Sequence, residues 1–270
     1  MTERSSRTRR LLGRLVTGHG GPDARFGARL LAGTALTALA AVPFSLALVL
    51  VESHWAPLHR LDQGVAERLH RSALDHPAWV QVLDLLTHVA WGPATMRILV
   101  AGVVVWLLWR RAFRLAAWAA VTAIAGGLVG LLVKNVVERA RPHLPDPVAH
   151  APGFSFPSGH SMTAVTSCAV LLLVLLPLVP RAWRPLPWVL AAVAVVGVGY
   201  TRVALGVHWV SDVLGGWLLG LAVVTATTLA FEAWRGDVGR SRTTPAEGLE
   251  PEITTDDPEP AVNSAGGKLR

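Results

Sequence analysis

The hydrophobic residues of this chain fall into six long runs separated by short polar segments. The runs are Arg29 to Val51, Pro93 to Trp109, Arg114 to Val133, Ser161 to Leu178, Leu186 to Leu205 and Val210 to Ala233. Each approaches the roughly 20 apolar residues that a helix needs to cross a bilayer. The pattern therefore predicts an all-α, multi-pass membrane bundle of six transmembrane helices.

A different pattern lies between the first two runs. Leu58, Leu61, Val65 and Leu69 recur at spacings of three and four among charged residues, which is typical of an amphipathic helix. We expect this helix to lie in the outer membrane interface. It could cover the end of the bundle or gate the sideways entry of a lipid, and we favour the covering role.

Composition agrees with a membrane protein, because 52% of the 270 residues are hydrophobic and only 16% are charged. The formal net charge of +7 could suggest a nucleic-acid partner, but the basic residues flank the apolar runs. The segments that flank the runs contain Arg4, Arg7, Arg9, Arg10, Arg14, Arg25, Arg110, Arg111, Arg114, Arg181, Arg184, Arg235, Arg240 and Arg242. We therefore attribute the charge to membrane orientation and expect no nucleic acid to bind.

With an even number of spans, all these arginine-rich segments share one face, which the positive-inside rule makes cytoplasmic. We expect a cell-membrane protein with both termini in the cytoplasm. Residues 1–28 form an arginine-rich segment, residues 29–235 the membrane domain, and residues 236–270 a disordered tail, because the last region has almost no large apolar side chains. Its oligomeric state is left open.

Three polar clusters interrupt the apolar pattern, each at the end of a predicted span. They are KNVVERARP from Lys134 to Pro142, PSGH from Pro157 to His160, and TRVALGVHWVSD from Thr201 to Asp212. The predicted topology brings all three to the extracytoplasmic face. Ionisable groups within a membrane domain are costly and usually functional.

The third cluster contains a histidine and a carboxylate four residues apart. His208 and Asp212 lie at the predicted start of the last span, so their side chains share one helical face. The carboxylate can hold the proton of one ring nitrogen and leave the other nitrogen free to attack. His208 is thus a candidate nucleophile, oriented by Asp212.

Three cations lie in the same clusters. Arg202 could bind two phosphate oxygens as a fork, or could simply reach the membrane interface. Lys134 and Arg141 are seven residues apart and could face one cavity or contact lipid headgroups. We expect Glu138 and Arg139, between them, to be solvated neighbours.

In the second cluster, Ser158 is a candidate helix cap and the amides that follow it form an anion site. Gly159 would let the backbone approach a phosphoryl group, and His160 could act as a general acid; plain helix capping is equally compatible with these residues. The acids do not cluster further, so we expect neither a metal site nor a cofactor. His143 and His150 are interpreted as polar loop residues.

These three clusters resemble the tripartite signature of the type 2 phosphatidic acid phosphatase superfamily. That signature reads Lys, six residues, Arg-Pro; then Pro-Ser-Gly-His; then Ser-Arg, five residues, His, three residues, Asp. The departure is Thr201 in place of serine, which keeps the hydroxyl. The resemblance covers about residues 80 to 233.

The resemblance implies a metal-independent membrane lipid phosphatase with a phosphohistidine on His208 and with His160 as general acid and then base. It implies that Lys134, Arg141, Ser158, Gly159 and Arg202 bind the phosphoryl group. Substrates would be a polyprenyl diphosphate, phosphatidate or phosphatidylglycerol phosphate. Two alternatives stay open: a phosphotransferase that uses an alcohol acceptor, and a non-catalytic lipid-binding or transport protein.

Overall fold

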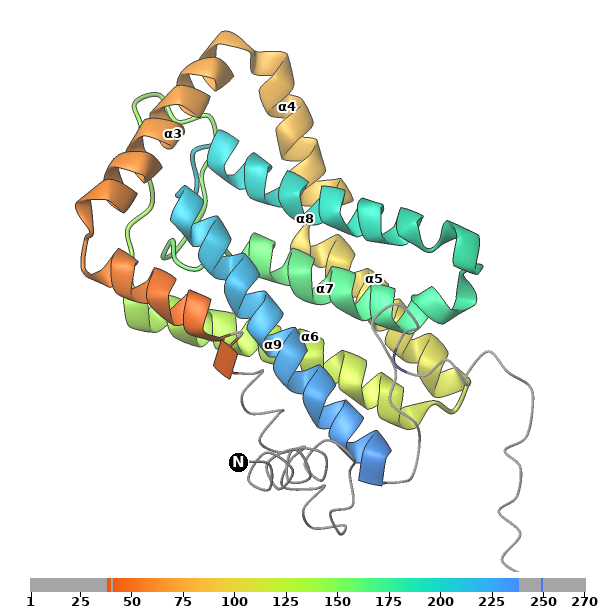
Figure 1. Ribbon diagram of the computed structural model, residues 1–270. Helices are drawn as coiled ribbons and strands as arrows, with labels where there is room; N and C mark the ends of the chain where they lie inside the picture. Colours follow the sequence, from red (N-terminus) through yellow and green to blue (C-terminus); the bar gives the residue numbers. More distant parts are fainter. Residues whose placement is uncertain (1–37, 40, 238–248, 250–270) are drawn as a thin grey trace, which may run out of the picture.

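The computed structural model describes residues 38–39, 41–237 and 249, and over these ranges the secondary structure is helical (Figure 1). An unlabelled helix at Ala41–Glu52 comes first. It is followed by α3 (Ala56–Asp75), α4 (Pro77–Leu85), η1 (Leu86–Ala90), α5 (Pro93–Trp109), α6 (Phe113–Val137), α7 (Gly159–Leu175), η2 (Leu176–Leu178), η3 (Arg181–Trp183), α8 (Pro185–Ala204) and α9 (Val210–Asp237). The all-α prediction is confirmed.

Five helical stretches are long and apolar enough to cross a membrane. Four of them match predicted spans within a few residues, and the fifth is longer than predicted, since α4, η1 and α5 together cover Pro77–Trp109. The first predicted span corresponds to Ala41–Glu52, which bends by 86° into α3 and counts as a sixth span only together with it. The start of that predicted span lies outside the described residues.

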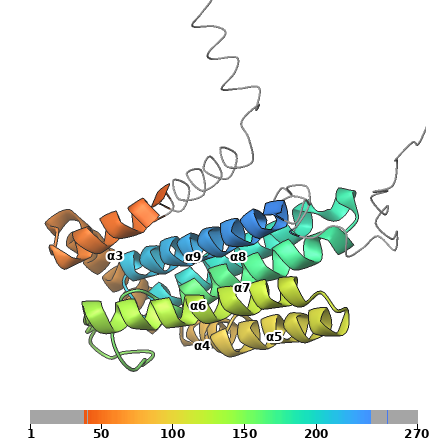
Figure 2. The same ribbon diagram turned by 90° about the horizontal axis from the view of Figure 1, so that it is seen from below.

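α7 is the central helix of the bundle, packed against α5, α6, α8 and α9 (Figures 1 and 2). In its most apolar stretch 67% of the residues are buried, against 22% to 39% in the other four. Small residues allow this close packing: a Cβ on Gly130 would lie 2.8 Å from Met162 Sδ, and one on Gly216 would lie 2.6 Å from the Ser158 carbonyl oxygen.

The outer helices present large apolar side chains to their surroundings. Ile98 on α5, Leu132 on α6 and Val193 on α8 are all more than half exposed. A water-soluble domain would not keep such a continuous apolar surface, whereas lipid tails solvate it at no cost. The structure is therefore that of a multi-pass membrane protein.

The predicted amphipathic helix is α3, but its buried face is not the predicted one. Leu61, from the expected apolar stripe, is 50% exposed. The buried residues are Asp62, Ala66, His70 and Ala73. They form a neighbouring stripe at spacings of three and four, and α3 packs with it across the ends of α8 and α9 (Figure 1). A carboxylate can occupy a buried position here because polar partners surround it.

The three polar clusters meet at one end of the bundle, where α6 and α8 end and α7 and α9 begin. The arginine-bearing turns at Arg110–Arg111 and Arg181–Arg184 lie at the opposite end. α9 continues to Asp237, two residues beyond the predicted end of the membrane domain. Beyond Asp237, and apart from Leu249, the predicted tail lies outside the described residues.

Candidate active site

The start of α9 positions a histidine and a carboxylate against each other. Trp209 is the last residue before the helix, and its backbone N–H donates to Asp212 Oδ2 over 2.8 Å, as in a capping box. The same oxygen lies 3.3 Å from His208 Nδ1. This contact assigns the proton to Nδ1, and it leaves the lone pair of His208 on Nε2.

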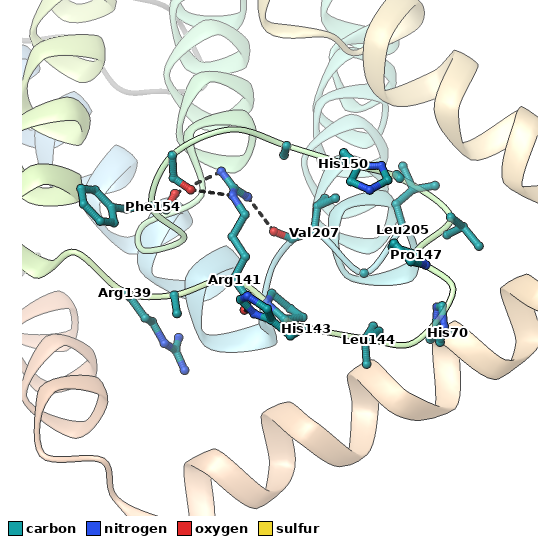
Figure 3. A pocket seen from close by; sticks show the side chains of 17 residues that line it. His70, Arg139, Arg141, His143, Leu144, Pro147, His150, Phe154, Leu205 and Val207 are labelled. Carbon is teal, nitrogen blue, oxygen red and sulfur yellow. Dashed lines mark hydrogen bonds between the residues drawn. The ribbon is translucent and has the colours of Figure 1, made fainter.

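Arg141 lies directly at that second nitrogen. Its Nη1 is 3.1 Å from His208 Nε2 and donates to the Val207 carbonyl over 2.6 Å. The rest of the guanidinium donates to the carbonyls of Pro152, Gly153 and Phe154. Figure 3 shows this side chain reaching back across its own loop. A donor at Nε2 agrees with the tautomer set by Asp212, and the predicted proximity of Arg141 to His208 is present.

His208 is almost fully buried, and burial lowers the pKa of its imidazole to about 4 because the charged form loses its hydration. Desolvation outweighs the hydrogen bond to Asp212, which raises the pKa. The imidazole is therefore neutral at pH 7, as a nitrogen nucleophile must be. Burial also lowers the pKa of Arg141 below its ordinary value.

We expect His208 to stay neutral as the pH falls from 7 and to gain its proton only near pH 4, because its pKa is lowered from the ordinary 6.5. Titration of the ring nitrogens by NMR in ¹⁵N-histidine-labelled protein measures this, and the signal missing from His208→Ala assigns it. Protonation already complete near pH 6 would contradict a buried neutral nucleophile.

At the start of α7, the serine and the glycine of PSGH have different surroundings. Ser158 is buried, and its Oγ accepts hydrogen bonds from the Ser161 backbone N–H over 3.4 Å and from Ser161 Oγ over 3.0 Å. It is the helix cap. Gly159 is exposed, and a Cβ there would meet no heavy atom within 4 Å among the residues described. This open space lies at the positive end of the helix dipole, where an anion is favoured.

Gly159→Ala is expected to fold with at least wild-type stability, because the added methyl meets no described atom and alanine is the better helix former. Turnover of a phosphorylated lipid should fall about 10²-fold if the open space holds the phosphoryl group. Gly127→Ala, an exposed position on α6 with equally open surroundings, is the matched control. Equal kcat/KM for both variants would contradict the assignment.

Two buried polar atoms near His208 find no hydrogen-bond partner within the described part of the chain. They are His160 Nε2 and Arg202 Nε. Arg202 donates one long hydrogen bond of 3.4 Å, to Thr87 Oγ1, which lies in the π-helical turn η1. Both side chains interact electrostatically with one another, and His160 also does so with His208. Buried polar groups left unpartnered in this way indicate a site built for a polar ligand.

Lys134 completes the constellation from the end of α6. Its Nζ donates to the Phe154 carbonyl over 2.7 Å, an oxygen that Arg141 also contacts. It interacts electrostatically with Arg141, Asp212 and Arg202. Lys134, Arg141 and Arg202, from three separate segments, therefore surround the His208 region as the sequence predicted.

Arg139 is placed differently from its prediction as a solvated neighbour. It pairs with Asp62 over 2.9 Å and with Asp212 over 2.6 Å, and its side chain is only 16% exposed. Figure 3 shows Arg139 and Arg141 pointing away from each other. Ser155 is a further residue that the motif analysis missed, and its Oγ donates to Asp212 Oδ2. No spacing rule links residue 62 to residue 139, so the sequence carries no signal for the ion pair between Asp62 and Arg139.

A pocket of about 530 Å³ lies beside Arg139 and Arg141, both of which line it (Figure 3). It is lined by His70, His143 and His150 together with apolar loop residues, but not by His208 or His160. Across the described ranges, no group of three or more His, Cys, Asp or Glu side chains could hold a metal ion. The two loop histidines, predicted to be polar loop residues, are exposed.

The chain is similar to one family model and to two phosphatases of known name. The family model described as the PAP2 superfamily matches residues 114–235. Phosphatidylglycerophosphatase B of Bacillus subtilis (strain 168) is 43% identical over 96 residues, which are 35% of this chain and 47% of that protein. Undecaprenyl-diphosphatase of Sulfolobus acidocaldarius is 31% identical over 121 residues, covering 42% and 54%.

A solved structure shares the fold. The crystal structure of a transmembrane PAP2 type phosphatidylglycerolphosphate phosphatase from Bacillus subtilis superposes with a TM-score of 0.66 at 25% identity, over 76% of this chain and 98% of that one. The chain spans about half the length of the curated relatives it matches. The matched region contains all three polar clusters.

Proposed function

Residues 114–235 belong to the PAP2 superfamily, and from this premise we propose that the protein is an integral membrane lipid phosphatase that works through a phosphohistidine. Its substrate is a lipid phosphomonoester or diphosphate. The names of the relatives favour phosphatidylglycerol phosphate and undecaprenyl diphosphate within that class.

The observation that carries the proposal is a neutral nucleophile surrounded by three cations, beside two buried nitrogen atoms that have no hydrogen-bond partner in the described ranges. His208 Nε2 keeps its lone pair, while Arg202 Nε and His160 Nε2 have no partner among the described side chains and backbone. A phosphoryl group placed here would receive donors from Arg141, Arg202 and Lys134. Three cations and a helix N-terminus can neutralise its charge without a metal ion.

The first step transfers the phosphoryl group to the enzyme. His208 Nε2 attacks phosphorus, the N–P bond forms, and the bond from phosphorus to the lipid-side oxygen breaks. His160 gives that leaving oxygen a proton. The Nδ1–H of His208 keeps its hydrogen bond to Asp212, which stabilises the positive charge of the phosphohistidine.

The second step returns the enzyme to its starting state. His160, now neutral, takes a proton from a water molecule whose oxygen attacks phosphorus. The N–P bond breaks and its electron pair returns to Nε2. Inorganic phosphate leaves, with Arg141 again free to contact the ring nitrogen. The net reaction consumes one water and regenerates both histidines.

The active site is assigned to the extracytoplasmic face, because the arginine-rich turns occupy the opposite end of the bundle. Asp146→Cys in the loop after Arg141 and Arg111→Cys in the α5–α6 turn test this, since both positions are exposed. A membrane-impermeant maleimide applied to intact cells should label the first and spare the second. The reverse labelling would overturn the assigned orientation.

The function is tested by phosphate release from purified protein in detergent containing EDTA. Undecaprenyl diphosphate, phosphatidate and phosphatidylglycerol phosphate are compared, and His208→Ala serves as the inactive control. We expect EDTA-resistant release with a preference among the three. Release only on addition of an alcohol acceptor, with the acceptor phosphorylated, would instead establish the transferase.

A further inference from the structure

The buried carboxylate of α3 makes contacts that the proposed mechanism does not use. Asp62 is fully buried. Its Oδ1 accepts from the Ser211 backbone N–H over 3.0 Å, and its Oδ2 accepts from Ser211 Oγ over 2.5 Å and from Arg139 Nη2 over 2.9 Å. A residue on a separate helix thus caps the first turn of α9, the turn that carries Asp212.

Arg139 bridges this carboxylate to the active site. Its Nη1 donates to Asp212 Oδ1 over 2.6 Å and to Ser211 Oγ over 2.6 Å. The two oxygens of Asp212 therefore have separate tasks: Oδ1 is held by Arg139, and Oδ2 faces His208 Nδ1. Rotation of this carboxylate is restrained from both sides.

The charges of the three linked side chains, Asp62, Arg139 and Asp212, matter as much as their geometry. Arg139 alone would neutralise Asp212 and leave little negative charge to stabilise the cationic imidazole ring that forms when His208 is phosphorylated. Asp62 adds a second negative charge, so the group of Asp62, Arg139 and Asp212 carries a net charge of −1. In a buried setting, one unit of charge several ångströms away has a large effect.

From these contacts we propose that Asp62 and Arg139 are positioning residues for the phosphoryl-transfer site. They hold Asp212 in the orientation that His208 needs, and they keep its negative charge available to the ring. The amphipathic helix α3 is therefore part of the catalytic apparatus, in addition to covering the end of the bundle. This inference rests on the proposed function, since the residues act through the nucleophile assigned there.

The first test replaces single charges at constant shape. Asp62→Asn should lower kcat about 10- to 100-fold, which is the range for residues that orient a catalytic side chain without contacting the substrate. KM should change by less than about threefold, because the phosphate-binding cations are untouched. Glu67→Gln, the same chemical change at an exposed position of α3, should behave as wild type. An unchanged kcat in Asp62→Asn would overturn the proposal.

A second test measures the direction in which the pKa of His208 shifts when a charge of either sign is removed. If the two residues had only a structural role, the direction of the shift would not depend on the sign of the removed charge. Asp62→Asn removes negative charge and should lower the pKa of His208, whereas Arg139→Met removes positive charge and should raise it. The NMR titration of His208 measures both. The other ionisable groups that interact with this ring are unchanged: Arg141 from the loop, His160 from α7, Arg202 from α8 and Asp212 from α9. Lys134 from α6, which interacts with Arg141, Arg202 and Asp212, is unchanged as well.

The double variant Asp62→Asn with Arg139→Met restores the net charge of −1. It should return the pKa of His208 toward the wild-type value. Shifts of the same sign in both single variants, or a double variant whose pKa stays at that of either single variant, would refute the coupling. The titration needs no substrate, so a failed phosphatase assay would count against the proposed function and leave this inference separately testable.

Discussion

His208→Ala is expected to reduce phosphate release from a lipid phosphate by about 10⁴-fold or more, because removing a covalent nucleophile disables the whole catalytic unit. Asp212 keeps donors from Trp209, Arg139 and Ser155 in this variant. The free energy of unfolding should therefore fall by only about 1–3 kcal/mol. Steady-state phosphate release and thermal unfolding in the same detergent measure the two effects.

His150→Ala is the matched control, since His150 is an exposed histidine in the loop after Arg141 and belongs to the neighbouring pocket. It should retain wild-type turnover. A second check uses radiolabelled substrate and an alkaline detergent quench: wild type should carry an alkali-stable label that acid then removes, and His208→Ala should carry none. Full turnover by a folded His208→Ala protein would rule out His208 as the nucleophile.

Asp212→Asn is expected to have the second-largest effect, with a loss of kcat of about 10³- to 10⁴-fold. An amide can present its NH₂ to His208 and so favour the wrong tautomer. It also removes the negative charge that stabilises the phosphohistidine. KM should change little, since Lys134, Arg141 and Arg202, the cations proposed to bind the phosphoryl oxygens, are unchanged.

Stability should also fall in Asp212→Asn, because the substitution breaks a buried ion pair with Arg139. Removing one partner of such a pair typically costs about 3–5 kcal/mol. Chemical denaturation of the purified protein tests this, with Asp75→Asn at the exposed end of α3 as a comparison. A kcat within about tenfold of wild type would show that Asp212 does not orient the nucleophile.

The starts of three spans could be predicted from the apolar pattern alone. α6, α8 and α9 begin within one residue of the predicted spans, because a run of apolar residues bounded by arginines has one stable position relative to a bilayer. The second span was predicted too short. α4 and η1 contain polar residues such as Asp84 and His88, which interrupt the hydropathy signal but not the helix.

The motif residues were also readable from the chain. The sequence predicted that His208 and Asp212 share a helical face; in the structure His208 precedes α9 and contacts Asp212 in the first turn of that helix. Gly159 lies at a helix N-terminus, as predicted. Both placements are local consequences of where a helix begins. The convergence of the clusters required one further premise, the alternation of spans across the membrane.

The face that α3 buries could not be read from its sequence. Hydropathy predicts that Leu61 faces the bundle and that Asp62 faces solvent. In the structure Asp62 is buried and Leu61 is half exposed. Hydropathy assigns a carboxylate to water because burial without partners is costly. Here Ser211 and Arg139 supply those partners, and both come from segments about 77 to 149 residues away.

The sequence by itself thus determined the all-helical class, the order of the spans and the approximate bounds of four of them, since each depends on neighbours within a few turns of helix. It also supplied the candidate residues for the chemistry. Tertiary structure alone decided which charged side chains pair behind the nucleophile. Arg139 and Arg141 are two residues apart, and only the placement of α3 and α9 around them sends one to Asp62 and Asp212 and the other to His208. Such long-range pairings offset the free-energy cost of burying a charge, and they cannot be predicted from any local sequence pattern.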